Sequence, residues 1–136
     1  MSIEFPQNQS EKIKKVTIVP EEKFASKLTP IYTSEITDPE TGEDVGSVDF
    51  QLKIKEKKMI VQHIYINKPR QGYGVSTYRM LRDLYPDYTL NDSGEAMRAK
   101  DNPEQELANA EYLWKKLVQL GDAEEIEGGG YRMKIK

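Results

Sequence analysis

The sequence contains no cysteine and a single histidine, His63. A chain without thiols forms no disulfide, holds no metal through thiolates and offers no cysteine nucleophile. One imidazole also argues against a histidine-based metal site, because such sites draw on several ligands. These absences leave His63 as the one imidazole available for chemistry.

Long apolar runs and a basic excess are absent too. No stretch approaches the roughly 20 apolar residues of a membrane-spanning helix. Residues 1–10 lack the basic start and apolar run of a secretory signal, so we expect a cytoplasmic protein with no membrane partner. The 23 acidic residues outnumber the 20 basic ones, which argues against nucleic acid as the main partner, because neutralising phosphates needs a net basic face.

The length of 136 residues suits a single domain with one core. Residues 1–11 are polar, so we expect a flexible N-terminus followed by one domain over residues 12–136. Apolar and polar residues alternate over residues 45–55, which predicts a strand with one wet face. Residues 59–66 alternate too little for that, which predicts a strand buried on both faces.

The patterns as a whole predict a chain of hairpin-linked strands followed by one strand–helix–strand crossover, a further helix and a final hairpin. The expected strands cover residues 12–19, 31–37, 45–55, 59–66, 88–91, 123–127 and 131–135. The expected helices cover residues 20–28, residues 75–85, and a segment that begins at an Asn102 cap and ends at a Gly121 cap. This order predicts an α/β fold, in which helices cover the faces of one mixed sheet.

A glycine-spaced turn follows the strand at residues 59–66. Pro69 cannot donate to a sheet ladder and ends the strand, whereas Gly72 and Gly74 allow a close approach to the main chain. The free N–H groups at the start of the next helix would bind a phosphate or pyrophosphate. The alternative is a plain strand–turn–helix connection, in which the glycines only make the turn.

Two segments resemble motifs of the GNAT superfamily of N-acetyltransferases. Residues 69–74, Pro-Arg-Gln-Gly-Tyr-Gly, resemble its Gln/Arg-x-x-Gly-x-Gly/Ala loop, with Pro69 where Gln or Arg is usual. Residues 110–117, Ala-Glu-Tyr-Leu-Trp-Lys-Lys-Leu, resemble its Ala-x-x-Leu-Tyr-x-x-Leu helix, with Trp114 at the tyrosine position. The resemblance covers roughly residues 30–135 and implies an α/β fold with a GNAT-like mixed central β-sheet flanked by helices on both faces.

The resemblance also implies a function, acetyl transfer from acetyl-CoA as co-substrate to a primary amine of a protein or small molecule. The cofactor-binding residues that it implies are Ile64, Tyr65, Ile66, Arg70, Gln71, Gly72, Tyr73, Gly74 and Val75. The family usually has two helices between its first two strands, and only one short helix fits here. The acceptor side should therefore be open, which fits a protein or peptide amine, or no acceptor at all. The alternative is a catalytically impaired domain that acts as a CoA-binding or protein-interaction module. A third hypothesis is that the exposed arm of the splayed sheet pairs with another chain, giving a homodimer or partner complex.

Two residues decide how such a site would work. Trp114 lies on an apolar helical stripe and an indole N–H is not a practical proton source, so we expect a core aromatic instead of the family's acid. His63 is the candidate base, because an imidazole ordinarily titrates near neutrality. Its strand parity points it away from the usual base positions, so this role needs a β-bulge to re-aim it. The alternative is a histidine packed on the far face.

Overall fold

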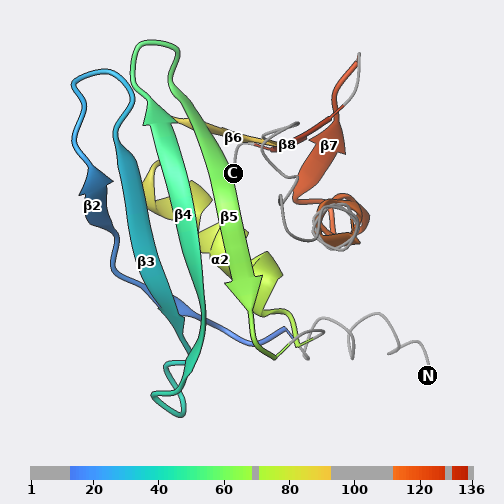
Figure 1. Ribbon diagram of the computed structural model, residues 1–136. Helices are drawn as coiled ribbons and strands as arrows, with labels where there is room; N and C mark the ends of the chain where they lie inside the picture. The colour runs from blue at the N-terminus through green and yellow to red at the C-terminus, as the bar shows by residue number, and fades with distance from the viewer. Residues whose placement is uncertain (1–12, 69–70, 93–111, 128–129, 135–136) are drawn as a thin grey trace, which may run out of the picture.

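The computed structural model describes residues 13–68, 71–92, 112–127 and 130–134, and these form one eight-stranded mixed sheet (Figure 1). The strand order is β1-β3-β4-β5-β6-β8-β7, and β2 also pairs with β3. The strands are β1 Thr17–Ile18, β2 Glu21–Phe24, β3 Ile31–Thr37, β4 Asp44–Lys53, β5 Lys58–Ile66, β6 Thr89–Asn91, β7 Ala123–Glu125 and β8 Tyr131–Met133. Helix α2 spans Tyr73–Leu84, and residues 112–119 are also helical.

The centre of the sheet is an antiparallel meander of β3, β4 and β5. Its inner face is apolar, as the alternation in residues 45–55 predicts: Val48, Phe50 and Leu52 are all buried. β5 then crosses through α2 to β6, which pairs with β5 in parallel. The predicted hairpins and the crossover are therefore confirmed.

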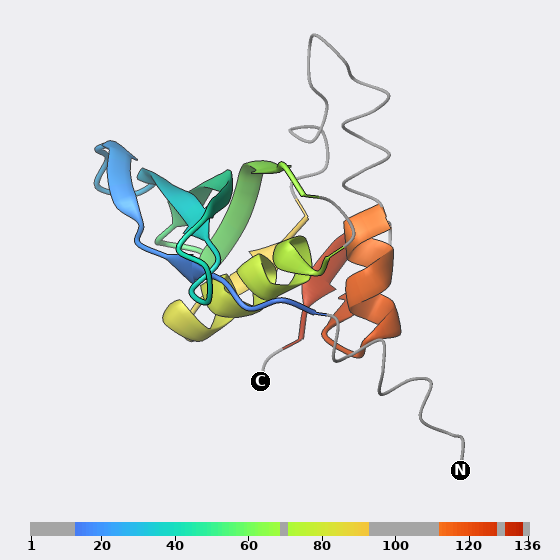
Figure 2. The ribbon, with the colours of Figure 1, turned by 90° about the horizontal axis from the view of Figure 1, so that it is seen from below.

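The two helical segments contact each other. The ring of Tyr78 on α2 meets the Trp114 ring edge-on, with centroids 5.1 Å apart. Arg79 on α2 donates two hydrogen bonds to Asp122, just after the second segment, at 2.9 and 2.6 Å. Figure 2 shows α2 running beneath the strands on one side of the sheet, with the second segment beside it. The predicted glycine cap is also present, since Gly121 has a φ of 86°.

The expectation of a GNAT-like α/β fold with helices on both faces is wrong for this chain. The described residues are mostly strand, and only the two short helical segments accompany the large mixed sheet. The expected helix over residues 20–28 is instead the short strand β2, paired with β3. The physical reason is that a helix this short is marginal alone, whereas the edge of β3 offers unpaired main-chain groups.

Several other expectations can be placed only in part. The first strand is shorter than expected, since β1 covers only Thr17–Ile18. The expected N-terminal segment, the Asn102 cap and most of the loop over residues 92–101 lie outside the described residues. Within the described ranges, no helix is long and apolar enough to cross a membrane.

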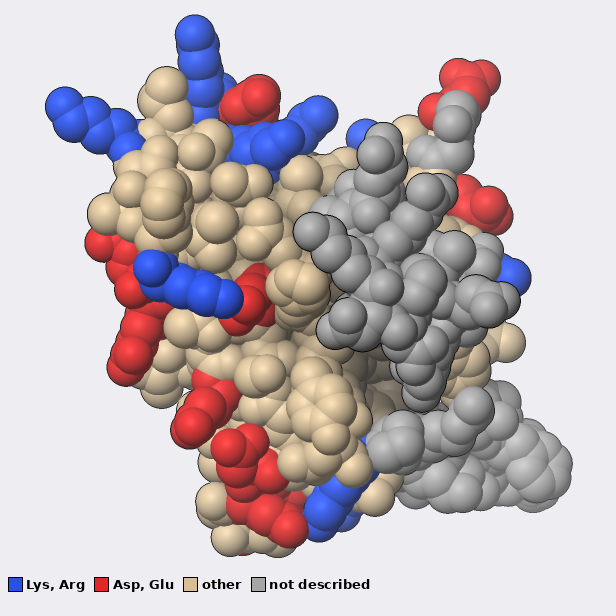
Figure 3. Space-filling model, viewed as in Figure 1, with Lys and Arg blue, Asp and Glu red and all other residues tan. Residues whose placement is uncertain are grey.

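One face of the β3–β4–β5 meander carries the core and α2, and no described helix covers the other, which we call the open face. Along each strand the side chains that alternate with the buried ones point to this open face. Figure 3 views the molecule from this side, and acidic side chains gather towards the left and lower edges of the view. The open-face residues used below are Thr33 and Glu35 on β3, Ser47 and Asp49 on β4, and His63 and Tyr65 on β5.

Candidate functional site

Strand β5 has a free edge over its second half. It pairs with β6 only over residues 58–60, and Figure 1 shows β6 beside the N-terminal end of β5. From Val61 to Ile66, β5 pairs with β4 on one side, and no described strand pairs with it on the other. Such an edge offers N–H and C=O groups to an extended ligand that contains amides.

Main-chain hydrogen bonds alternate in direction along β5, and this alternation decides which residues turn their N–H and C=O groups to the free edge. The amide of Asn67 donates to the carbonyl oxygen of Val45 at 2.9 Å. Because main-chain bonding alternates along an antiparallel pair, Tyr65 bonds towards β4, while Ile64 and Ile66 turn their N–H and C=O groups outward. The structure thus places two of the predicted ligand-binding residues on the free edge through their main chain.

The chain leads from this edge to the start of α2, where Gly72 is the N-cap with a φ of 86°. The first turn contains no acidic residue, and the amide of Ser76 closes the first helical bond to the carbonyl of Gly72 at 3.0 Å. Among the described residues, the amides of Tyr73, Gly74 and Val75 have no acceptor. Free N–H groups at the positive end of a helix dipole favour an anion.

The expected glycine loop differs in one respect from the structure. Gly74 lies in the first turn of α2 instead of in a loop before it, because the helix begins two residues earlier than its apolar spacing predicts. The side chains of Tyr73 and Val75 are buried, so they offer only main-chain groups to a ligand. Gln71 is exposed beside the helix start, and the predicted Arg70 lies outside the described residues.

The two glycines also allow close packing of neighbouring segments. This packing partly favours the alternative in which the glycines serve the turn and not a ligand. A Cβ on Gly72 would lie 2.6 Å from the Cα of Ile13, and one on Gly74 would lie 3.2 Å from a methyl group of Leu113. The segment that contains Ile13 is fastened here, because the amide of Lys14 donates to the carbonyl of Gln71 at 3.0 Å. Glycine is therefore required at position 72 by the chain itself, whether or not a ligand binds.

Among the described residues, two buried polar side-chain atoms lack hydrogen-bond partners. They are the acceptor Oδ1 of Asn91, the last residue of β6, and the donor Nε1 of Trp114. The Trp114 ring stacks on Tyr131 at 5.7 Å, and the carbonyl of Tyr131 accepts a bond from the amide of Asp92 at 2.9 Å. Each orphaned group costs about 1–3 kcal/mol unless something pairs with it, so a polar group that reached either atom would be stabilised there.

The predicted burial of Trp114 is confirmed, since only 1% of the residue is exposed. The role of Asn91 is not visible in the sequence, because its strand is only three residues long and it reads as an ordinary strand end. Asn91 stands out only in the folded chain, where its amide oxygen is buried and accepts no hydrogen bond from a described residue.

His63 lies on the open face and is exposed. A bulge places it there: Asp49 pairs with His63, but Phe50 pairs with Val61, so Gln62 is the extra residue of β5. The bulge that a re-aimed histidine requires is therefore present. The expectation that residues 59–66 are buried on both faces is wrong, since Tyr65 is 63% exposed on the same face.

Asp49, opposite His63, belongs to a hydrogen-bonded cluster. Its Oδ1 accepts a bond from the Thr33 hydroxyl at 2.6 Å, and its Oδ2 accepts one from Lys23 Nζ at 2.8 Å. Burial raises the pKa of Asp49, but these two hydrogen bonds and the positive charges of Lys23 and His63 outweigh it and lower the pKa below its ordinary value. Asp49 is thus an ionised carboxylate beside the only imidazole of the chain.

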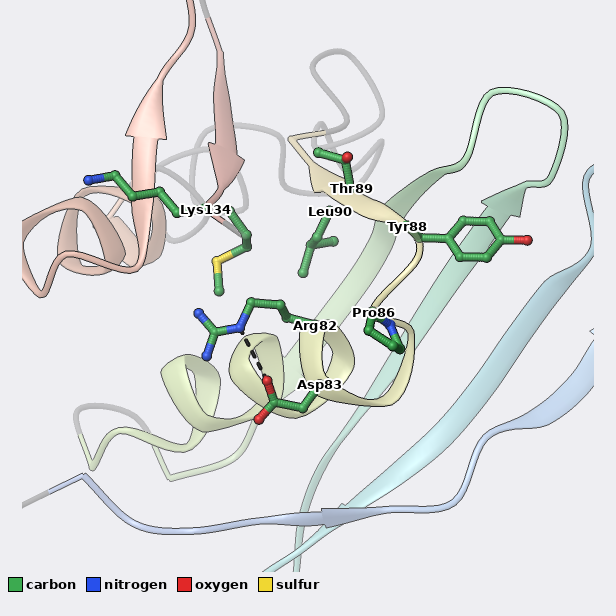
Figure 4. A pocket seen from close by; sticks show the side chains of 8 residues that line it. Arg82, Asp83, Pro86, Tyr88, Thr89, Leu90 and Lys134 are labelled. Carbon is green, nitrogen blue, oxygen red and sulfur yellow. Dashed lines mark hydrogen bonds and ion pairs between the residues drawn. The ribbon is translucent and has the colours of Figure 1, made fainter. Parts of the chain in front are cut away.

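A hollow of about 270 Å³ lies elsewhere, at the C-terminal end of α2 (Figure 4). Its apolar floor includes Leu90 and Met133, and Figure 4 shows Arg82 turned towards Asp83. The Arg82 guanidinium is also 3.4 Å from an oxygen of Asp122, so its charge is already neutralised. The hollow contains none of the residues that the sequence predicts as a site.

Comparison with protein-family models, curated proteins and solved structures finds no match to this chain. The similarity to the GNAT superfamily therefore stays a resemblance of two short motifs. Of these, residues 71–74 and 112–117 are within the described part of the chain. Any functional conclusion has to come from the geometry of the site.

Proposed function

We propose that the protein binds acetyl-CoA along the free edge of β5 and transfers its acetyl group to a primary amine. One observation carries this proposal: within the described residues, β5 has an unpaired edge on which Ile64 and Ile66 face outward, and the amides of Tyr73–Val75 at the start of α2 have no acceptor. Such an arrangement suits a ligand whose extended arm contains amides and ends in a diphosphate. The strand edge would pair with the arm, and the helix start would hold the diphosphate.

The two orphaned polar atoms fit the same ligand. Asn91 Oδ1 would accept a hydrogen bond from an amide N–H, and Trp114 Nε1 would donate one to a carbonyl oxygen. Gln71 would lie beside the diphosphate, where it contributes polarity without a charge. These groups are all supplied by main chain or by neutral side chains, so binding depends on the helix dipole for its electrostatic part.

When bound, acetyl-CoA supplies a thioester whose acyl C–S bond breaks as an amine forms the new C–N bond and the thiol is released. The chain contributes a base for the amine, which arrives as an ammonium ion at neutral pH. His63, exposed on the open face, would take one proton from that ammonium and return it to solvent. Because no described helix covers this face, the acceptor can be a side chain on another protein.

The alternative of a CoA-binding module without catalysis is supported by one observation. Trp114 occupies the position of the family's acid, and it is buried against Tyr78 and Tyr131. An indole does not protonate a leaving thiolate, so release of the thiol depends on water or on the ease with which a thiolate leaves. A CoA-binding module would bind acetyl-CoA as tightly as an active enzyme would, but it would release no thiol.

An assay of thiol release separates the two functions. Acetyl-CoA is incubated with a panel of primary amines that includes a lysine-containing peptide, and released thiol is followed by a colorimetric reagent. We expect amine-dependent release by the wild-type protein and a loss of about 100-fold in His63→Gln, the usual scale for a general base. Release that His63→Gln leaves unchanged would remove His63 from the chemistry. Tight binding without release on any amine would establish the module.

A further inference from the structure

The open face carries a row of four residues that lie side by side on four strands. The register pairs Glu21 on β2 with Thr33 on β3, Thr33 with Asp49 on β4, and Asp49 with His63 on β5. Directly opposed residues point to the same face with Cβ atoms about 5 Å apart. The row therefore brings a carboxylate and an imidazole together on neighbouring strands.

The Asp49 carboxylate is held in place by donors on β2 and β3. The Thr33 hydroxyl holds Oδ1 and the Lys23 ammonium holds Oδ2, and only 17% of the Asp49 side chain is exposed. Lys23 is itself 56% exposed, so water screens its charge on the outer side. Asp49 thus keeps lone pairs and negative charge for a partner on the β5 side.

We propose that Asp49 is a positioning residue for His63: its carboxylate, anchored by Thr33 and Lys23, orients the imidazole on the open face and stabilises its protonated form. The inference rests on the proposed function, because it gives His63 the fixed geometry that a base for the acceptor ammonium needs. The proton taken from that ammonium stays on the imidazole while the amine attacks, and it then passes to water. The Asp49 carboxylate is not protonated in this sequence.

The bulge at Gln62 determines the face of the sheet on which His63 lies. Without the extra residue, His63 would continue the parity of Met59 and Val61 and point into the core. The bulge turns it to the face of Asp49 instead. A strand that bulges at one residue, beside a carboxylate held by two donors, is the kind of local irregularity that aims a functional side chain.

Other titratable groups on this face also act on the imidazole. Among the described residues they are Glu21 and Lys23 on β2, Glu35 on β3, Lys53 on β4, and Lys58 and Tyr65 on β5. Glu35 lies in the adjacent row, which runs from Glu35 through Ser47 to Tyr65. Glu35 is therefore the matched control, with the same charge on the same face but in a different row.

The single histidine makes a direct test possible by NMR without any enzyme assay. The ring protons of His63 are titrated with pH in the wild type, in Asp49→Asn and in Glu35→Gln. Because loss of the carboxylate removes the stabilisation of the imidazolium, we expect the titration midpoint in Asp49→Asn to fall by about 0.5 pH unit, the scale of a partly exposed ion pair. Glu35→Gln should move it by less than half as much.

The reciprocal experiment guards against a variant that does not fold. Coupling between two sites is mutual, so His63→Gln should raise the midpoint of the Asp49 carboxyl titration by the same amount. In the acetyl-transfer assay, the acidic limb of the rate profile should shift with Asp49→Asn as the ring titration does.

The outcomes of these experiments separate the two proposals. Equal and opposite shifts establish the Asp49–His63 pair even if no amine is acetylated, in which case only the proposed function fails. An unchanged His63 midpoint in a folded Asp49→Asn, or a shift no larger than that of Glu35→Gln, would overturn the positioning role even in an active enzyme.

Discussion

At the residue scale, Trp114 shows how one side chain serves the core and lines the candidate site. Its ring is stacked on Tyr131 and meets Tyr78 edge-on, and aromatic pairs of this kind add to the energy of area burial. Its indole N–H has no partner among the described residues, which lowers the net stability that the ring contributes. The residue is therefore held by packing and is available for a hydrogen bond to a ligand.

Substitution of Trp114 measures these two contributions separately. Trp114→Ala is expected to lower the free energy of unfolding by about 3–5 kcal/mol, as large aromatic deletions from cores do. Trp114→Phe should cost much less, because it keeps most of the buried area and removes the unpaired donor. Urea unfolding followed by circular dichroism gives both values. Equal stability of the wild type and Trp114→Ala would contradict the core role.

At the element scale, the sequence predicts those elements whose periodicity matches their environment. The β3–β4 hairpin, the crossover through α2 and the Gly121 cap follow from alternation, helical spacing and turn chemistry. The acidic residues after Pro20 suit a helix start, so the sequence predicts a helix where the structure has β2. A strand forms instead, because the edge of β3 offers main-chain partners. Local propensity is a weak prior where a neighbouring strand offers main-chain partners.

The candidate site also combines features that have a local sequence signal with features that depend on the folded structure. The glycine-spaced connection and the candidate base are visible in the sequence, since proline, glycine and a lone histidine are local signals. The pairing of Asp49 with His63 depends on the register of two strands, and the orphaned Asn91 oxygen depends on tertiary burial. Neither has a signature within a short window of residues, so sequence reasoning could not find them.

Two glycines at the ends of helices offer a matched test of what surrounds the start of α2. Gly72 and Gly121 both have a φ of 86°, but a Cβ on Gly121 would meet nothing within 4 Å, whereas one on Gly72 would meet Ile13. Gly121→Ala should cost about 1 kcal/mol, from backbone strain alone. Gly72→Ala should cost at least about 3 kcal/mol, because a clash adds to the strain.

The measurement is urea unfolding of the two variants side by side. Gly121→Ala reports strain in the left-handed region, so the difference between the variants reports the packing of the segment at Ile13. Equal losses of stability would show that this segment does not cross Gly72 in solution.

At the scale of the whole molecule, the packed core and the candidate chemical groups lie on different faces of the sheet. One face of the meander holds the core and α2, the open face carries the Asp49–His63 pair, and the free edge of β5 joins that face to the start of α2. In the proposed function, an acyl donor on the edge and an amine approaching the open face would meet at His63. This arrangement needs no helix over the open face, which agrees with the correction to the expected fold.

The most direct test of this account is titration calorimetry with acetyl-CoA, with desulfo-CoA as the non-reacting control. Gln71→Glu and Gln71→Lys each introduce one exposed charge beside the start of α2 without altering its backbone. Repulsion of the diphosphate should weaken binding about 3- to 10-fold in Gln71→Glu, and Gln71→Lys should strengthen it. The helix dipole favours an acidic residue here, so Gln71→Glu should unfold no more easily than the wild type. Absence of binding by the wild type, or equal affinities in both variants, would contradict a CoA site at the start of α2.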